Sequence, residues 1–347
     1  MTLSDRIESF AFLGETLRDA LAGKQTKFTS HLHQLINNQQ IKNLWFTPDN
    51  VKLSVSVIAN ELTLDNLNKW CSDYPELNDV SEPLNAGVIM AGNIPLAGFH
   101  DFLSVLISGN RITAKKSSKD PDLIELIKDI VISFNPEFVN MISLNEGKIS
   151  GFDVVIATGS DNSSRYFEYY FGRYPHIIRR NRNSIAIIDG TESDDELRDL
   201  GKDIFSYFGL GCRNISKIWL PAGYKVSEIT KKWDRFSGII NHYKYANNYD
   251  FHKAVFLINK EEFTDTGYLI CKEDDRLSSP VSVLYYSYYN SKEELDLWID
   301  INKEKIQCIT GHNFIPFGKA QAPYLWDYAD GIDTLEFLSK KKVPGIL

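Results

Sequence analysis

The first 80 residues place apolar side chains at the spacing of amphipathic helices. Over residues 10–21 and 62–70, hydrophobic positions recur three and four residues apart with polar residues between them. A turn-forming stretch at 47–50, with the sequence TPDN, lies between these two segments. We therefore expect the N-terminal region to be mostly helical.

From residue 86 onward, short apolar runs alternate with helical stretches. Strands are expected over 86–91, 111–115, 138–142, 153–158, 184–189, 215–220, 281–289 and 307–310. Helices are expected over 96–107, 121–134, 194–208 and 292–302. This alternation is typical of an α/β protein whose parallel sheets are covered by helices on both faces.

The alternation begins again near residue 187, which suggests two domains. We expect the N-terminal helices and a first α/β domain over 1–187, and a second α/β domain over 188–316. Residues 317–347 are expected to form a loop-like tail, and packing of this tail on the first domain is left open.

Composition and charge exclude several classes of function. The net charge of −8 and the pI near 5.5 disfavour a nucleic-acid binder, which needs a basic face. No signal peptide is recognised, and no apolar run approaches the ~20 residues of a membrane span, so we expect a cytoplasmic protein. The four cysteines form no CxxC pair and the histidines are scattered, so no metal site is expected.

Cys212 is the candidate nucleophile. Gly209 and Gly211 precede it, and glycine allows a sharp turn or a close approach to a ligand. The positive charge of Arg213 next to it favours a reactive thiolate. The alternative is a small buried hydrophobic side chain in a tight turn. The other three cysteines are expected to be packing residues.

Three further polar groups follow expected strands, where ligands bind in parallel sheets. The Asn93 amide can donate to a developing oxyanion, or it simply belongs to a turn. The segment 115–119, with the sequence KKSSK, suits a phosphate group or a solvated loop. Thr158-Gly159-Ser160 precedes a helix whose N-terminus can hold a pyrophosphate, although no GxGxxG motif is present.

Together these motifs resemble the aldehyde dehydrogenase superfamily. The order and approximate spacing match for Gly92-Asn93-Ile94-Pro95-Leu96, for Gly109-Asn110 leading to Lys115, for 158–160 and for 209–212. The segments CRNISK at 212–217 and LSSPV at 277–281 are similar to the LuxC-type acyl-CoA reductases, the fatty acid reductase branch. The resemblance covers roughly residues 83–320. It implies an aldehyde-dehydrogenase-like fold with two Rossmann-like parallel-sheet domains.

The resemblance also implies roles for individual residues. Cys212 matches the nucleophile and Asn93 matches the oxyanion-binding asparagine. The expected cofactor-binding residues are Lys115, Ser117, Ser118, Gly159 and Ser160. The implied reaction is reduction of an acyl-CoA, with a fatty acyl group, to the aldehyde through a cysteine thioester.

Two departures from the family pattern refine this expectation. Hydrolytic members use a glutamate where residues 178–183 here read IRRNRN, so CoA rather than water is expected to exchange with the acyl group. NAD-preferring members often carry a glutamate at the position of Ser118, so NADPH is expected rather than NADH. The alternatives are an aldehyde dehydrogenase that acts oxidatively and a non-catalytic relative that binds nucleotide or acyl groups. Acyl chain length, homo-oligomerisation and an acyl-delivering partner enzyme are left open.

Overall fold

The computed structural model describes residues 1–79, 82–159 and 161–339, and the chain forms two compact units. The first unit comprises Met1–Asn181 and Tyr324–Leu347, and the second comprises Arg182–Pro323. The division expected after residue 187 would remove strand β6 (Asn183–Ile187) from the sheet of the second unit, in which it pairs with β7 and β11. The expected tail also divides, since the chain from Tyr324 belongs to the first unit.

The sheet of the first unit has five parallel strands among the described residues, in the order β3-β2-β1-β4-β5. They are β1 (Asn85–Ile89), β2 (Arg111–Lys115), β3 (Ile142–Asn145), β4 (Val154–Thr158) and β5 (His176–Arg179). The strand expected over 138–142 is wrong, because Pro136–Asn140 forms the short 3-10 helix η2. Pro136 suits a first helical turn, and the Asn135 side chain accepts from the Glu137 N–H at 3.1 Å.

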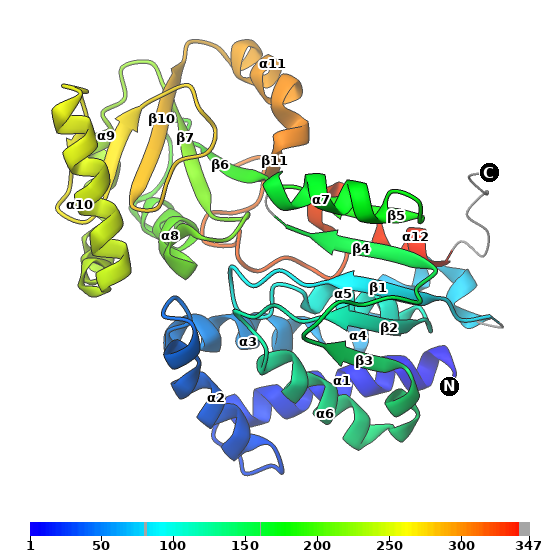
Figure 1. Ribbon diagram of the computed structural model, residues 1–347. Helices are drawn as coiled ribbons and strands as arrows, with labels where there is room; N and C mark the ends of the chain where they lie inside the picture. The colour runs from blue at the N-terminus through cyan, green and yellow to red at the C-terminus, as the bar shows by residue number, and fades with distance from the viewer. Residues whose placement is uncertain (80–81, 160, 340–347) are drawn as a thin grey trace. The chain divides into compact units, whose positions relative to one another are not determined.

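Helices cover both faces of this sheet (Figure 1). They are α1 (Leu3–Leu21), α2 (Thr29–Lys42), α3 (Pro48–Glu61), α4 (Leu64–Ser72), α5 (Phe99–Ile107), α6 (Leu123–Phe134), α7 (Asp161–Phe171) and α12 (Thr334–Ser339), with η1 (Pro75–Asn78) and η6 (Ala329–Gly331). A capping box between Thr2 and Asp5 begins α1. The main core joins α1, α5 and α6 to one face of the sheet. On the other face, Phe167 and Phe171 of α7 pack with Phe152 and Val155.

The sheet of the second unit has six strands within the described residues, in the order β11-β6-β7-β10-β9-β8. Besides β6 they are β7 (Ile215–Pro221), β8 (Thr264–Asp265), β9 (Ile270–Glu273), β10 (Val283–Tyr289) and β11 (Ile306–Thr310). All pairings are parallel except that of β8 with β9. This parallel order is what the sequence alternation predicts.

Helices also cover both faces of the second sheet. They are α8 (Asp194–Phe205), α9 (Val226–Thr230), α10 (Tyr243–Ile258) and α11 (Lys292–Asn302), with η3 (Ser206–Gly209), η4 (Lys231–Asn241) and η5 (Lys303–Lys305). The Trp233 indole N–H of η4 donates to the Leu197 carbonyl of α8 at 2.8 Å, inside the core that these helices share with β7 and β10. On the other face, Trp298 of α11 packs edge-to-face on Trp219 of β7, with the ring centroids 4.9 Å apart.

Candidate functional site

A pocket of about 480 Å³ lies at the carboxyl ends of β1 and β2 in the first unit. Its lining residues are Ile89, Met90, Lys115, Lys116, Ser117, Ser118, Pro121 and Glu146. The structure therefore brings together three of the predicted cofactor-binding residues, Lys115, Ser117 and Ser118. This edge is where open parallel sheets bind their ligands, because strand ends and the loops after them expose polar groups there.

Glu146 is the residue of this pocket that sequence reasoning missed. It directly follows β3, which pairs with β2, so the sheet brings it to the same edge as Lys115. Its carboxylate lies 3.7 Å from the Lys116 ammonium, which also donates to Glu125 at 2.7 Å. The pocket therefore contains an acid, although position 118 lacks one, and part of its positive charge is already balanced.

The loop that carries Asn93 is tied down on both sides of that residue. A Cβ at Gly92 would lie 2.1 Å from the Ser117 Oγ and 2.7 Å from its Cβ, so only glycine fits against the pocket loop. Leu96 has a left-handed φ of 56°, and its N–H donates to the buried Asp120 carboxylate at 2.7 Å. Asn93 itself is exposed.

Gly159 lies after β4, where the sequence predicts a pyrophosphate-binding turn. A Cβ at this position would lie 2.8 Å from the Phe167 ring and 2.9 Å from the Ser163 Cβ, both on α7. Glycine is therefore required for the close approach of the strand end to this helix. Ser160, the predicted partner of Gly159, lies outside the described residues.

Cys212 follows an unusual turn at the end of α8 in the second unit. Tyr207, Phe208 and Gly209 all have left-handed backbone, with φ of 52°, 58° and 77°. Left-handed backbone at a non-glycine residue costs on the order of 1 kcal/mol and persists only where surrounding contacts hold it. Helix α8 ends at Phe205, short of the expected residue 208, because the backbone of Ser206 is no longer helical. The Cys212 side chain is exposed.

Two buried side chains hold the Cys212 loop. The Asn214 Oδ1 accepts from the Gly211 N–H at 2.8 Å, and its Nδ2 donates to the carbonyls of Asp203 at 2.9 Å and Ser206 at 2.8 Å. Ser184 of β6 donates from Oγ to the Cys212 carbonyl at 2.9 Å. Asn214 has a local signal, an asparagine between the Gly-x-Gly-Cys motif and a strand. Nothing near Ser184 in the sequence points to its role.

The other three cysteines have surroundings unlike those of Cys212. Burial raises the pKa of Cys71 and of Cys271 to about 12, so both stay protonated at neutral pH. Cys308 is buried in β11, with its Sγ 3.1 Å from the Ser184 Oγ. Among the four cysteines, all in the described part of the chain, Cys212 alone is exposed.

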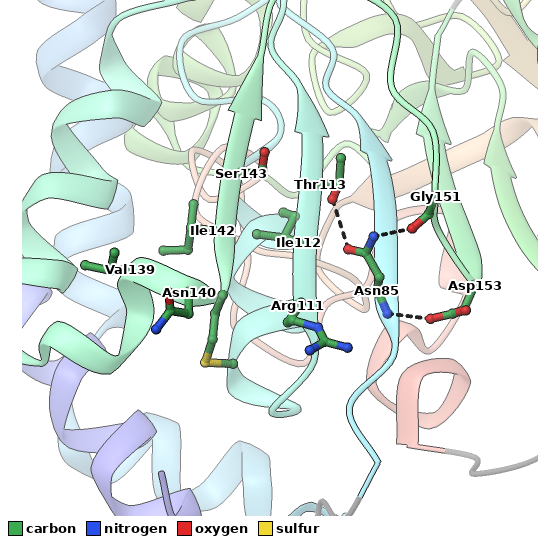
Figure 2. A pocket seen from close by; sticks show the side chains of 11 residues that line it. Asn85, Arg111, Ile112, Thr113, Val139, Asn140, Ile142, Ser143, Gly151 and Asp153 are labelled. Carbon is green, nitrogen blue, oxygen red and sulfur yellow. Dashed lines mark hydrogen bonds between the residues drawn. The ribbon is translucent and has the colours of Figure 1, made fainter.

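A second pocket in the first unit lies at the opposite edge of the sheet and contains none of the predicted residues. It measures about 450 Å³ and is lined by the amino ends of β1, β2 and β3 and by Gly151 and Asp153 (Figure 2). Asn85 holds this edge together: it accepts from the Thr113 hydroxyl at 2.9 Å, and its backbone N–H donates to Asp153 at 2.8 Å. These contacts stabilise the strand starts.

Asp189, Glu192 and His312 form a group in the second unit with potential metal-ligand atoms within 4.8 Å of one another. These side chains already bond locally. His312 lies 2.8 Å from Asp189, and Glu192 accepts the N–H groups of Asp189 and Gly190 at 2.6 and 3.0 Å. The hydrogen bond to Asp189 raises the pKa of His312. Such bonds explain the cluster without an ion, and absence of a metal stays a prediction.

Comparison with curated proteins and with solved structures found similar proteins. No family model matches the chain. A long-chain acyl-protein thioester reductase from Aliivibrio fischeri is 26% identical over 54% of this chain, and the match spans 42% of that protein. Thus the matched part is less than half of the length of this curated relative.

Solved structures agree on the fold. Aldehyde dehydrogenase 21 from Physcomitrella patens matches 90% of this chain and 74% of its own, with a TM-score of 0.63 and 12% identity. An aldehyde dehydrogenase from Mycobacterium tuberculosis, solved with NAD+, matches 89% and 73%, with a TM-score of 0.62 and 15% identity. No helix in the described ranges is both long and apolar enough to cross a membrane. The predicted aldehyde-dehydrogenase-like fold is confirmed, and the match to the acyl-protein thioester reductase supports the resemblance to the LuxC-type branch.

Proposed function

We propose that this protein reduces a fatty acyl thioester, acyl-CoA, to the aldehyde with NADPH, and that Cys212 carries the acyl group. The observation that carries the proposal is the setting of Cys212: an exposed thiol on a turn of left-handed backbone, held by the buried Asn214 and Ser184. A curated relative named as a long-chain acyl-protein thioester reductase supports the reduction of an acyl thioester.

A nicotinamide cofactor fits the residues of the first unit. Lys115, Ser117 and Ser118 line one pocket at the carboxyl ends of the strands, and Gly159 lets the end of β4 approach α7 closely. We assign the ribose and phosphate contacts of NADPH to these residues, with Ser160. When bound, the cofactor supplies the hydride that reduces the acyl group.

The protein's own groups act on the thioester as follows. The Cys212 thiolate attacks the carbonyl carbon, and the negative charge moves to the carbonyl oxygen. From the family resemblance, we assign donation to that oxygen to the Cys212 backbone N–H and the Asn93 amide, and the charge returns as the bond to the CoA sulfur breaks and CoA leaves as a thiolate. The stretch 178–183 offers no carboxylate to activate water, and its Arg179 is buried in an ion pair with Asp101 at 2.5 Å. Reduction is therefore favoured over hydrolysis.

The test begins with Cys212→Ala. Intact-protein mass spectrometry after mixing with acyl-CoA should show an acyl adduct on the wild type and none on the variant. Cys71→Ala is the matched control and should keep both the adduct and aldehyde production. An adduct that persists in Cys212→Ala would show that another residue carries the acyl group.

A second experiment separates the direction of the reaction and the role of Asn93. We expect the absorbance of NADPH to fall when acyl-CoA is added to the wild type. Oxidation of the aldehyde, with water as the acyl acceptor, should be much slower. Asn93→Ala should slow acylation by about 10²–10³-fold, the usual effect of removing one oxyanion donor, while NADPH affinity is kept. Loss of NADPH binding in this variant would instead mean that Asn93 is a structural turn residue.

A further inference from the structure

Asp203 is a buried carboxylate of the second unit that has no role in the chemistry described above. It lies in α8 with no exposed surface. Its Oδ2 accepts from the Gly318 N–H at 2.7 Å, and its Oδ1 accepts from the Ala320 N–H at 3.0 Å. One side chain thus holds a main-chain segment more than 100 positions away in the sequence.

Segment 318–320 leads directly to one neighbour of Cys212. The Ala320 carbonyl accepts from the Arg213 Nε at 2.5 Å. Ala320 is itself fully buried, so this carbonyl has a fixed direction set by the N–H that Asp203 accepts from the same residue. The carboxylate therefore fixes one acceptor of the Arg213 guanidinium.

The main chain of Asp203 leads to the other neighbour of Cys212. Its carbonyl accepts from the Asn214 Nδ2 at 2.9 Å, and the Asn214 Oδ1 accepts from the Gly211 N–H at 2.8 Å. Asp203 is thus linked to Arg213 by its side chain and to Gly211 by its backbone. These two residues flank the thiol.

A purely structural tie at this place would not need a charge. Burial raises the pKa of Asp203 to about 7, while the N–H groups of Gly318 and Ala320, and the charge of Arg213, favour ionisation. An ionised carboxylate carries acceptor sites on both oxygens and no donor, which matches two N–H groups at once. The geometry uses both oxygens.

We propose that Asp203 is a positioning residue: through Gly318, Ala320 and Arg213 it sets the direction of the Cys212 thiol and the charge beside it. The proposal rests on the proposed role of Cys212 as nucleophile. Asp203 does not touch the reacting atoms, so its effect is expected on the acylation rate and not on the affinity for NADPH.

The first test is Asp203→Asn. The amide has the same shape, but it has one acceptor oxygen, and its NH2 group would face a backbone N–H. We expect kcat for aldehyde formation to fall by about 10²-fold, as for a comparable misplacement of a reacting group, with the NADPH dissociation constant unchanged. The rate at which iodoacetamide alkylates Cys212 should fall as well. The control is Asp195→Asn on the same helix, an exposed carboxylate paired with Arg198 at 2.5 Å, which should behave as wild type.

A second variant, Arg213→Lys, keeps the buried carboxylate and removes the Nε–H that Ala320 accepts. It should slow the alkylation of Cys212 in the same way, and the double variant should be no slower than the slower single variant. If Asp203→Asn does not fold, Arg213→Lys decides alone. Wild-type alkylation rates and kcat in a folded Asp203→Asn, or in Arg213→Lys, would overturn the proposal.

The two proposals can fail separately, because alkylation of Cys212 needs no acyl substrate. A wild type that forms no acyl adduct, with variants that still alkylate slowly, would overturn the proposed function and support the positioning role. An acylated wild type with normal alkylation in both variants would support the proposed function and overturn the positioning role.

Discussion

The buried carboxyl of Asp203 makes the stability of the protein depend on pH in a direction that can be calculated. Burial raises its pKa from 3.8 to about 7. The folded state therefore favours the protonated carboxyl, so stability from this group is complete below pH 3.8 and falls as the pH rises toward 7. Above pH 7 the loss is complete, because the group is ionised in both states.

The magnitude follows from the two pKa values. One pKa unit corresponds to about 1.36 kcal/mol, so ionisation of Asp203 lowers the free energy of unfolding by up to about 4 kcal/mol above pH 7. Part of this loss has already occurred at pH 5. The free energy of unfolding is therefore expected to fall by about 2–3 kcal/mol between pH 5 and pH 8. Asp203→Asn cannot ionise and should not show this change.

The assay is urea unfolding of wild type and Asp203→Asn at pH 5 and pH 8, followed by tryptophan fluorescence. The free energy of unfolding of the variant relative to wild type should rise by about 2–3 kcal/mol between the two pH values. Aldehyde formation by Asp203→Asn should remain slower than by the wild type at pH 8. Asp195→Asn, an exposed carboxylate, should parallel wild type. A difference between Asp203→Asn and wild type that is the same at both pH values would refute the reasoning.

Three further predictions concern the first unit. Gly92→Ala places a methyl group against Ser117, and an overpacked contact of this kind costs about 1–3 kcal/mol, so NADPH should bind more weakly in a fluorescence titration. Asp101→Asn leaves the buried Arg179 guanidinium without its carboxylate, and the free energy of unfolding should fall by about 3–5 kcal/mol in urea unfolding. Glu146→Gln removes an acid from the pocket lined by Lys115 and Ser118, so the ratio of the dissociation constants of AMP and 2′,5′-ADP should shift toward the phosphorylated ligand.

Each of these predictions has a matched control. Gly147→Ala, where a Cβ meets nothing within 4 Å, should bind NADPH normally. Asp129→Asn, an exposed acid of α6, should unfold like wild type. Ser118→Glu adds an acid to the same pocket and should shift the ratio in the direction opposite to Glu146→Gln. Identical ratios in the wild type and both variants would mean that this pocket does not recognise the ribose.

The sequence by itself determined the fold class and the positions of the main motifs. Alternating strands and helices are a local pattern, because hydrophobic periodicity depends on neighbours a few residues apart. Asn93, Lys115, Gly159 and Cys212 follow expected strands or helices, and their glycine neighbours carry a local signal of tight turns.

Only the tertiary structure decided which distant residues support these motifs. Strand pairing placed β6 in the second sheet and Glu146 beside Lys115. Hydrogen bonds across many residues connected Ser184 to Cys212 and Asp203 to Ala320. Such partners are chosen by three-dimensional packing, and a buried serine or aspartate has no pattern near it in the chain that names the N–H or carbonyl it will bind.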